Sequence, residues 1–130
     1  MKRAVFLNLS NHPVARWPAA QVQAARSLGL GDPCDLEGGL PEIDPKDDGS
    51  DVAVVAREVT ERALAQGAAG AFVAGEYTLS FALVNALQVR GVRCFAATSR
   101  REVVELDGDG DARERKIVFQ FVRFREYPRY

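Results

Sequence analysis

Short apolar runs alternate with stretches of helical periodicity over the first hundred residues of the chain. The strand-like runs cover 4–7, 71–74 and 92–97. Apolar positions recur at helical spacing over 19–28, 52–63 and 79–87. Strands and helices in this order predict an α/β fold, with a mostly parallel sheet and helices on both of its faces.

The segment 29–50 is rich in Gly, Pro and Asp, and its pattern is the least regular of the chain. A short strand over 34–36 fits it, and the rest is expected to be an ordered surface connection. The pattern leaves open whether this connection folds over a pocket as a lid. Ser50 or Asp51 is expected to cap the helix that follows.

The last third of the chain has a different character. The stretches 102–106 and 116–124 are rich in β-branched and aromatic residues, and they flank a charged, glycine-rich segment at 107–111. This arrangement predicts a C-terminal β-hairpin. The aspartates of the tip resemble a calcium loop at first sight, but Val118 stands where the bidentate glutamate is expected, which favours a simple hairpin tip.

Composition is that of an ordinary globular protein: 130 residues, 47% hydrophobic and 27% charged, which suits a single domain over 1–130. The formal net charge of −1 argues against long nucleic acid as a partner. No apolar run is long enough to cross a membrane, and the first residues do not look like a secretion signal. Cys34 and Cys94 are expected to be reduced thiols of a cytoplasmic protein, with a disulfide or metal pair as the alternative.

Polar loops follow the expected strands at 8–12, 75–78 and 98–101. The carboxyl ends of parallel strands share one edge of a sheet, and ligands collect there near a topological switch point. The sequence therefore predicts that these loops converge on one pocket.

The first of these loops carries short donors and acceptors at Asn8, Ser10 and Asn11, followed by His12, the single histidine of the chain. A histidine titrates near neutral pH and can act as a general acid or base. The alternative is a loop histidine that only helps to order the backbone before Pro13. Ser10 is a candidate catalytic hydroxyl, although no Ser–His–acid order can be identified in the sequence.

The second loop begins at Gly75, where the run 71–74 turns into a helix. Helix N-termini present free N–H groups and the positive end of the helix dipole, which favours an anion such as phosphate. Glu76 would repel phosphate at close range, so it fits a ribose hydroxyl or a helix cap better, and Thr78 is the other capping candidate. A turn glycine with a capping pair is the alternative explanation.

The third loop combines the hydroxyls of Thr98 and Ser99 with the guanidinium groups of Arg100 and Arg101. Arginine binds phosphate through its planar fork, so this loop is a candidate phosphate contact. The alternative is a solvated strand end, with Arg100 or Arg101 paired to Glu102 or Glu105.

Trp17 is a candidate for stacking on a base, and it can equally anchor the start of the first helix to the core. No His or Cys cluster has zinc spacing, and neither a Walker motif nor a Gly-x-Gly-x-x-Gly motif occurs, so we expect no metal and no cofactor.

The Asn-Leu-Ser-Asn-His-Pro segment at 8–13, the Gly-Glu-Tyr-Thr junction at 75–78 and the final hairpin together resemble CARF-type domains, the CRISPR-associated Rossmann-fold domains. The first loop is similar to the Ser/His-Pro opening of small stand-alone CRISPR-associated proteins of that group. The resemblance implies a Rossmann-like domain that forms a homodimer and binds a cyclic oligoadenylate second messenger across the two-fold axis.

Some proteins of that group are ring nucleases, in which a ribose 2′-hydroxyl attacks the adjoining phosphate without a metal. By this resemblance Asn8, Ser10 and His12 would belong to one ligand loop, and Gly75, Glu76 and Thr78 to the other. Catalytic candidates are His12, Ser10, Glu76 and Arg100. The alternative is a sensor or sponge that binds the messenger without cleaving it.

Overall fold

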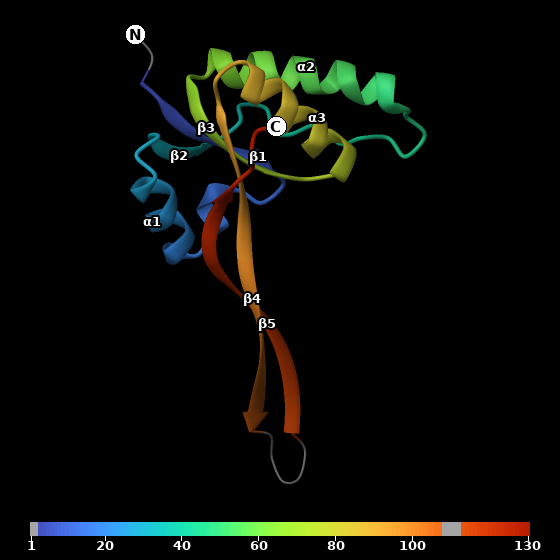
Figure 1. Cartoon of the computed structure of the whole chain (residues 1–130). Coiled ribbons are helices and arrows are strands. Elements are labelled where there is room, and N and C mark those ends of the chain that lie inside the picture. The colour runs from blue at the N-terminus through green and yellow to red at the C-terminus, as the bar shows by residue number, and fades with distance from the viewer. Residues whose placement is uncertain (1–2, 108–112) are drawn as a thin grey trace.

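The computed structural model describes residues 3–107 and 113–130. In chain order its elements are β1 (Val5–Ser10), the 3-10 turn η1 (Val14–Arg16), α1 (Ala19–Ser27), β2 (Asp32–Asp35), α2 (Gly49–Ala65), β3 (Ala68–Ala74), α3 (Tyr77–Val89), β4 (Arg93–Asp107) and β5 (Arg113–Glu126). Within this described part, the sheet has five strands in the order β2-β1-β3-β4-β5. All neighbouring strands are parallel except β4 and β5, so the predicted α/β class with a mostly parallel sheet and a C-terminal hairpin is confirmed (Figure 1).

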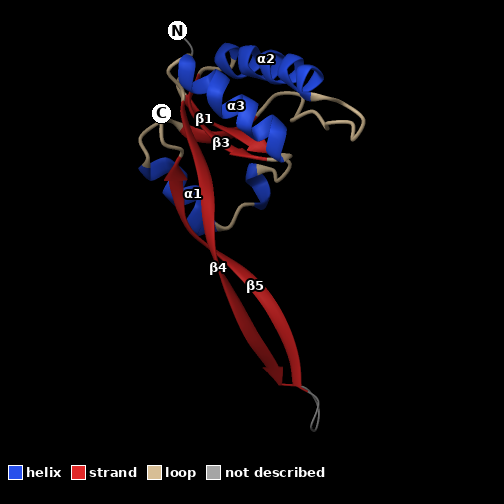
Figure 2. Ribbon diagram, turned by 45° about the vertical axis from the view of Figure 1, so that its right-hand side comes forward, coloured by secondary structure: helices blue, strands red, loops and turns tan. Residues whose placement is uncertain are grey.

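Strict alternation along the central strands sends side chains to opposite faces of the sheet. Leu7 and Leu9 of β1 pack with α2 and α3, whereas Phe6 packs on the α1 side. Helices therefore cover both faces, as predicted (Figure 2). Leu7, Leu9 and Phe6 are fully buried, and each contributes about 1.5–3 kcal/mol through the apolar surface that it removes from water.

Aromatic rings fill the layer beneath α1. Trp17 lies edge-on to Phe72 at 5.6 Å between centroids and contacts Phe124 at 6.0 Å. Only 6% of Trp17 is exposed, and its indole Nε1 donates to the His12 carbonyl at 3.0 Å. Because so little of Trp17 is exposed and its indole packs against Phe72 and Phe124, the structure favours the anchoring alternative over stacking on a base.

The hairpin is longer than the pattern indicates. Instead of ending near Ala97, β4 runs on to Asp107, and its pairing with β3 stops at Phe95. From there β4 pairs with β5 alone, and the two strands project from the body as a narrow arm (Figures 1 and 2). Residues 108–112, which hold the predicted hairpin tip, lie outside the described residues.

Helix starts differ slightly from expectation. The N-cap of α2 is Asp48 rather than Ser50 or Asp51, because its carboxylate accepts from both Ser50 N and Asp51 N while Asp51 reaches back to the Asp48 N–H. This reciprocal pair is a capping box, which satisfies N–H groups that the helix itself leaves unpaired.

Both cysteines are free, as predicted. Cys94 is buried in the core, and burial raises the pKa of its thiol to about 12, so it stays protonated at physiological pH. Burial also raises the pKa of Cys34. Among the described residues, no helix combines the length and apolarity that crossing a membrane requires.

Candidate functional site

The carboxyl ends of β2, β1 and β3 form one edge of the sheet. Ser10, the last residue of β1, is in register with Ala74, the last residue of β3, so the loops that begin at Asn11 and Gly75 start side by side. On the other side of β1, Asp35 at the end of β2 is in register with Asn8. Two of the predicted loops therefore meet.

A hollow of about 370 Å³ opens at this edge. Its walls come from β1, from the loop after β1 and from the loop after β2. The lining residues are Asn8, Ser10, Asn11, Pro13, Asp35, Leu36, Gly39 and Leu40.

Asn8 organises the polar floor of this hollow, and only 3% of it is exposed. Its side-chain amide donates to the His12 carbonyl at 2.8 Å and to Asp35 Oδ1 at 2.9 Å. Its Oδ1 accepts from the Ser10 hydroxyl at 2.6 Å. Every polar atom of the Asn8 side chain thus has a partner, which a polar group buried this deeply requires.

The loop after β1 is held through its backbone. The His12 carbonyl accepts from Asn8 and from the buried Trp17 indole, and the His12 N–H donates to Ser10 Oγ at 3.2 Å. The His12 side chain itself is exposed. Within residues 3–107 and 113–130 its imidazole makes no hydrogen bond, so both ring nitrogens can reach a ligand.

Asp35 is a site residue that the sequence analysis missed. Its Oδ1 accepts from Asn8 and, at 3.0 Å, from the Val14 N–H, which fixes the first loop to the end of β2. Among the described residues, Oδ2 accepts no hydrogen bond and remains available to a hydroxyl donor. The signal for this residue was its place after a short strand, at the same sheet edge as Ser10.

The loop after β2 forms a wall of the hollow and is tied to α2. The Arg62 guanidinium donates to the carbonyls of Glu37 and, at 3.2 Å, of Gly39. Gln66 donates to the Asp35 carbonyl at 2.7 Å and accepts from the Glu37 N–H at 3.0 Å. Part of segment 29–50 thus borders the pocket as a fixed wall.

Gly75 packs closely against the loop after β2, and its turn does not need a positive φ. A Cβ placed there would lie 3.2 Å from Cδ2 of Leu40, and the backbone of Gly75 has no positive φ. The strand-to-helix turn is therefore open to other residues by conformation, but a side chain at 75 would press against the wall of the hollow.

The N-terminus of α3 is capped by its own residue. The Glu76 carboxylate accepts from the Thr78 N–H at 3.1 Å, the Leu79 N–H at 2.9 Å and the Thr78 hydroxyl at 2.6 Å. These bonds, that of the Thr78 hydroxyl foremost, hold the pKa of Glu76 below its usual range. A phosphate here would have to displace a carboxylate, and Glu76 is a weak base in this setting.

The third predicted loop does not exist, because Thr98, Ser99, Arg100 and Arg101 lie within β4. Strand alternation puts Thr98 on the sheet face of Cys94, whereas Asn8 and Ser10 lie on the face of Phe6. The Thr98 hydroxyl donates to the Arg123 carbonyl of β5 at 3.1 Å. The expectation that these residues join the rim as a strand-end loop is therefore wrong, and both arginines are exposed on the arm.

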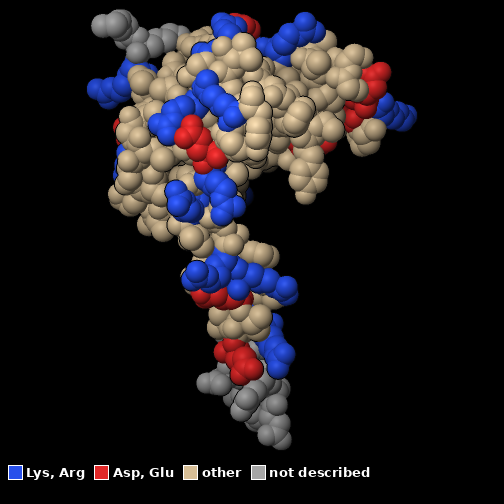
Figure 3. All heavy atoms as spheres, viewed as in Figure 1, with Lys and Arg blue, Asp and Glu red and all other residues tan. Residues whose placement is uncertain are grey.

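Charge is mixed over the surface. Figure 3 shows Lys and Arg interspersed with Asp and Glu on the body and along the arm, without a large patch of one sign on this face. The residues that line the hollow include the carboxylate of Asp35 but no Lys or Arg. Among the described residues, no three His, Cys, Asp or Glu side chains gather closely enough to hold a metal ion. The hollow is thus suited to hydroxyl and amide groups more than to a bare anion.

Comparison with known proteins adds one assignment. No curated protein and no solved structure matches the chain significantly. The model of the family described as "Uncharacterized protein MJ1673 family" matches residues 4–125, which include the whole sheet edge and the arm. The chain belongs to the MJ1673 family.

Proposed function

We propose that this protein binds a cyclic oligoadenylate as a homodimer, and that the bound ring is opened by one of its own ribose 2′-hydroxyls. The observation that carries the proposal is the Asn8–Ser10–Asp35 network, which stands at the edge where β1 and β3 end together. The resemblance of the two loops at this edge to CARF-type domains supplies the ligand class.

Topology supports the position of this site. The strand order β2-β1-β3-β4 supports a Rossmann-like arrangement, because the successive crossovers from β1 and β2 proceed in opposite directions along the sheet. In such sheets ligands bind outside the carboxyl ends at the switch point, which here lies between β1 and β3.

The chemistry of the hollow matches a ribose. Asp35 Oδ2 can accept from a ribose hydroxyl, and the exposed amide of Asn11 can bond a base edge or a second hydroxyl. In ring opening, the 2′-oxygen loses its proton and bonds to the adjoining phosphorus. The bond from phosphorus to the 5′-oxygen breaks, and that oxygen takes up a proton, leaving a 2′,3′-cyclic phosphate.

His12 is the residue best placed to move these protons, since its imidazole is exposed and not hydrogen-bonded within the described chain. Ser10 and Asn8 act as positioning residues that hold the His12 backbone. The arginines that the sequence suggested for the phosphate lie on the arm, so most of the rate enhancement must come from alignment of the 2′-oxygen.

A second candidate is a protein that binds the ring without cleaving it. It is favoured by the state of the polar groups: the Ser10 hydroxyl is already bonded to Asn8, and the Glu76 carboxylate caps α3. Among the described side chains at this edge, the His12 imidazole and Asp35 Oδ2 then remain for proton transfer.

The test is incubation of the pure protein with cyclic tetra-adenylate and cyclic hexa-adenylate, followed by separation of the products and measurement of melting shifts. We expect a linear product ending in a 2′,3′-cyclic phosphate, abolished in His12→Ala. Ser27→Ala, which removes an exposed hydroxyl bonded to the Gln23 carbonyl on α1, is the matched control and should cleave normally. Binding without turnover would assign the second candidate, and no melting shift with either ring would refute the proposal.

A further inference from the structure

The helix α3 is apolar on both of its sides. Its inward residues Leu79, Leu83 and Leu87 are almost fully buried, while Tyr77, Phe81 and Val89 are largely exposed and the half-buried Val84 points toward Tyr127. From Tyr77 to Val89 the sequence contains no Asp, Glu, Lys or Arg. A helix at the surface of a globular protein normally carries its charges on the outward side, and one that is apolar all round is usually buried.

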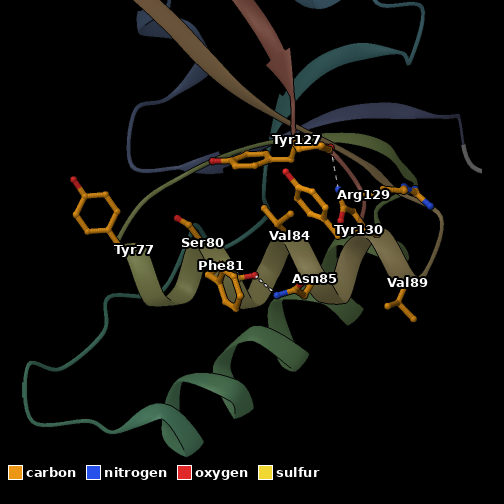
Figure 4. Close-up of a pocket in the computed structure, with 11 residues that line it drawn as sticks. Tyr77, Ser80, Phe81, Val84, Asn85, Val89, Tyr127, Arg129 and Tyr130 are labelled. Atoms are coloured by element: carbon orange, nitrogen blue, oxygen red, sulfur yellow. Dashed lines mark hydrogen bonds between the residues drawn. The ribbon is translucent and has the colours of Figure 1, made fainter.

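The outward side of α3 borders a groove. The C-terminal segment Tyr127–Tyr130 runs alongside, held by the Tyr127 N–H to the Cys94 carbonyl at 2.8 Å and by Gln88 to the Tyr127 carbonyl at 3.1 Å. Figure 4 shows the aromatic rings of both segments arranged around this groove, which has a volume of about 540 Å³. We call this surface the α3 face; its members are Tyr77, Phe81, Val84, Val89, Tyr127 and Tyr130.

Three of the four aromatic side chains of the α3 face are strongly exposed, and the fourth, Tyr127, is half-buried. Tyr77 is 91% exposed and Phe81 is 74% exposed, and Tyr130 is fully exposed. Isolated apolar side chains at a surface are ordinary, but several exposed aromatic and aliphatic side chains around one groove mark an interaction site.

We propose that the α3 face is the surface through which two copies of this chain form a dimer. The helix brings no charged side chain to this patch, so a two-fold axis through α3 places no like charges of the two helices against each other; Arg129, which also lines the groove, belongs to the C-terminal segment beside the helix. Two-fold interfaces bring the same patch of both subunits together, which requires the patch to be complementary to itself. Helices packed on each other in this way fit the ridges of one into the grooves of the other.

The exposed area is of the size that a dimer needs. At about 200 Å² for each aromatic side chain, Tyr77, Phe81 and Tyr130 expose roughly 550 Å² in the isolated chain. Val89, which is 86% exposed, and the rest of the groove add to this. A stable dimer buries about 800 Å² on each partner. The α3 face therefore supplies most of a standard interface.

A dimer formed here also bears on the nucleotide site. Because α3 starts immediately after Gly75, each copy contributes the start of a helix at the interface and the neighbouring hollow beside it. The inference gives the proposed homodimer a surface, but it stands on α3 alone and is tested without any nucleotide.

The experiment is sedimentation equilibrium of the full chain without ligand, for wild type, Phe81→Glu and Phe119→Glu. Phe119 is the matched control, since it is a phenylalanine of similar exposure, 69%, on the arm. We expect a wild-type dimer, a dissociation constant raised roughly thirtyfold or more by Phe81→Glu, and no change with Phe119→Glu. Circular dichroism checks that both variants are folded.

A wild-type monomer at 100 micromolar, on the order of the weakest useful affinities, would overturn the proposal. So would a dimer that survives Phe81→Glu, or one that Phe119→Glu dissociates, because the arm would then be the interface. A dimer with no affinity for cyclic oligoadenylate would leave this inference standing and refute only the proposed ligand.

Discussion

Replacing Asn8 with alanine tests the polar network on which the candidate site is built. The substitution leaves the His12 carbonyl, Asp35 Oδ1 and the Ser10 hydroxyl without their Asn8 partner. A hydrogen bond between neutral groups contributes about 1 kcal/mol and one to a carboxylate about 1.5–3 kcal/mol. Together the three bonds are worth about 4 kcal/mol.

Water reduces this loss of stability, because the hollow opens beside Asn8 and solvent can hydrogen-bond to the groups that lose their Asn8 partner. We therefore expect Asn8→Ala to lower the free energy of unfolding by about 2–4 kcal/mol. With an unfolding entropy of about 2.1 cal/mol/K per residue, the 130 residues give a fall in Tm of roughly 7–15 °C.

The measurement is thermal unfolding by circular dichroism without ligand, supported by urea titration. Asn11→Ala is the matched control, because Asn11 lies in the same loop and is exposed. Its Tm should stay within about 2 °C of wild type, as is usual for surface substitutions. An Asn8→Ala protein that melts as close to wild type as the control does would refute the role given to the network.

Two further predictions concern the arm and its base. Arg93 donates to both carboxylate oxygens of Glu126, at 2.9 and 2.7 Å, and this holds the pKa of Glu126 below its usual range. A carboxyl with a lowered folded pKa stabilises the fold above its unfolded pKa and loses that contribution as pH falls. Glu126→Gln should thus melt slightly below wild type at pH 7, with the difference vanishing below about pH 4; a constant difference would contradict this. Replacing 100–120 with Asn-Gly closes a turn between the paired residues Ser99 and Phe121. This deletion should leave Tm within a few degrees of wild type, because Val103, Ile117 and Phe119 of the arm are largely exposed. A large fall in Tm would show that the arm stabilises the body.

The pairing of the first two loops was predictable from the chain order alone. Parallel strands that alternate with helices end at one edge, and this places the residues after Ser10 next to those after Ala74 whatever the side chains are. The self-capping of Glu76 was also among the stated alternatives, because a carboxylate at the start of a helix has free N–H groups within reach.

Features that depend on pairing over long distances were not predictable. The polar run from Thr98 to Arg101 looks like a strand end, but pairing with β5 carries the strand through it. Asp35 was missed because the four residues of β2 give little pattern, and its role arises from register with Asn8. The sequence allows Trp17 to face either solvent or the core, and its orientation is set by contacts with the rings of Phe72 and Phe124, which are distant in the sequence.

The most direct test of the site is a titration of ¹⁵N-labelled protein with cyclic tetra-adenylate or cyclic hexa-adenylate, followed by amide chemical shifts. The account predicts that the largest changes fall on Ser10, Asn11 and Asp35, which line the hollow, and on His12 and Gly75 in the loops at the same sheet edge. Shifts confined to the α3 face or to the arm, or no shifts with either ring, would contradict it.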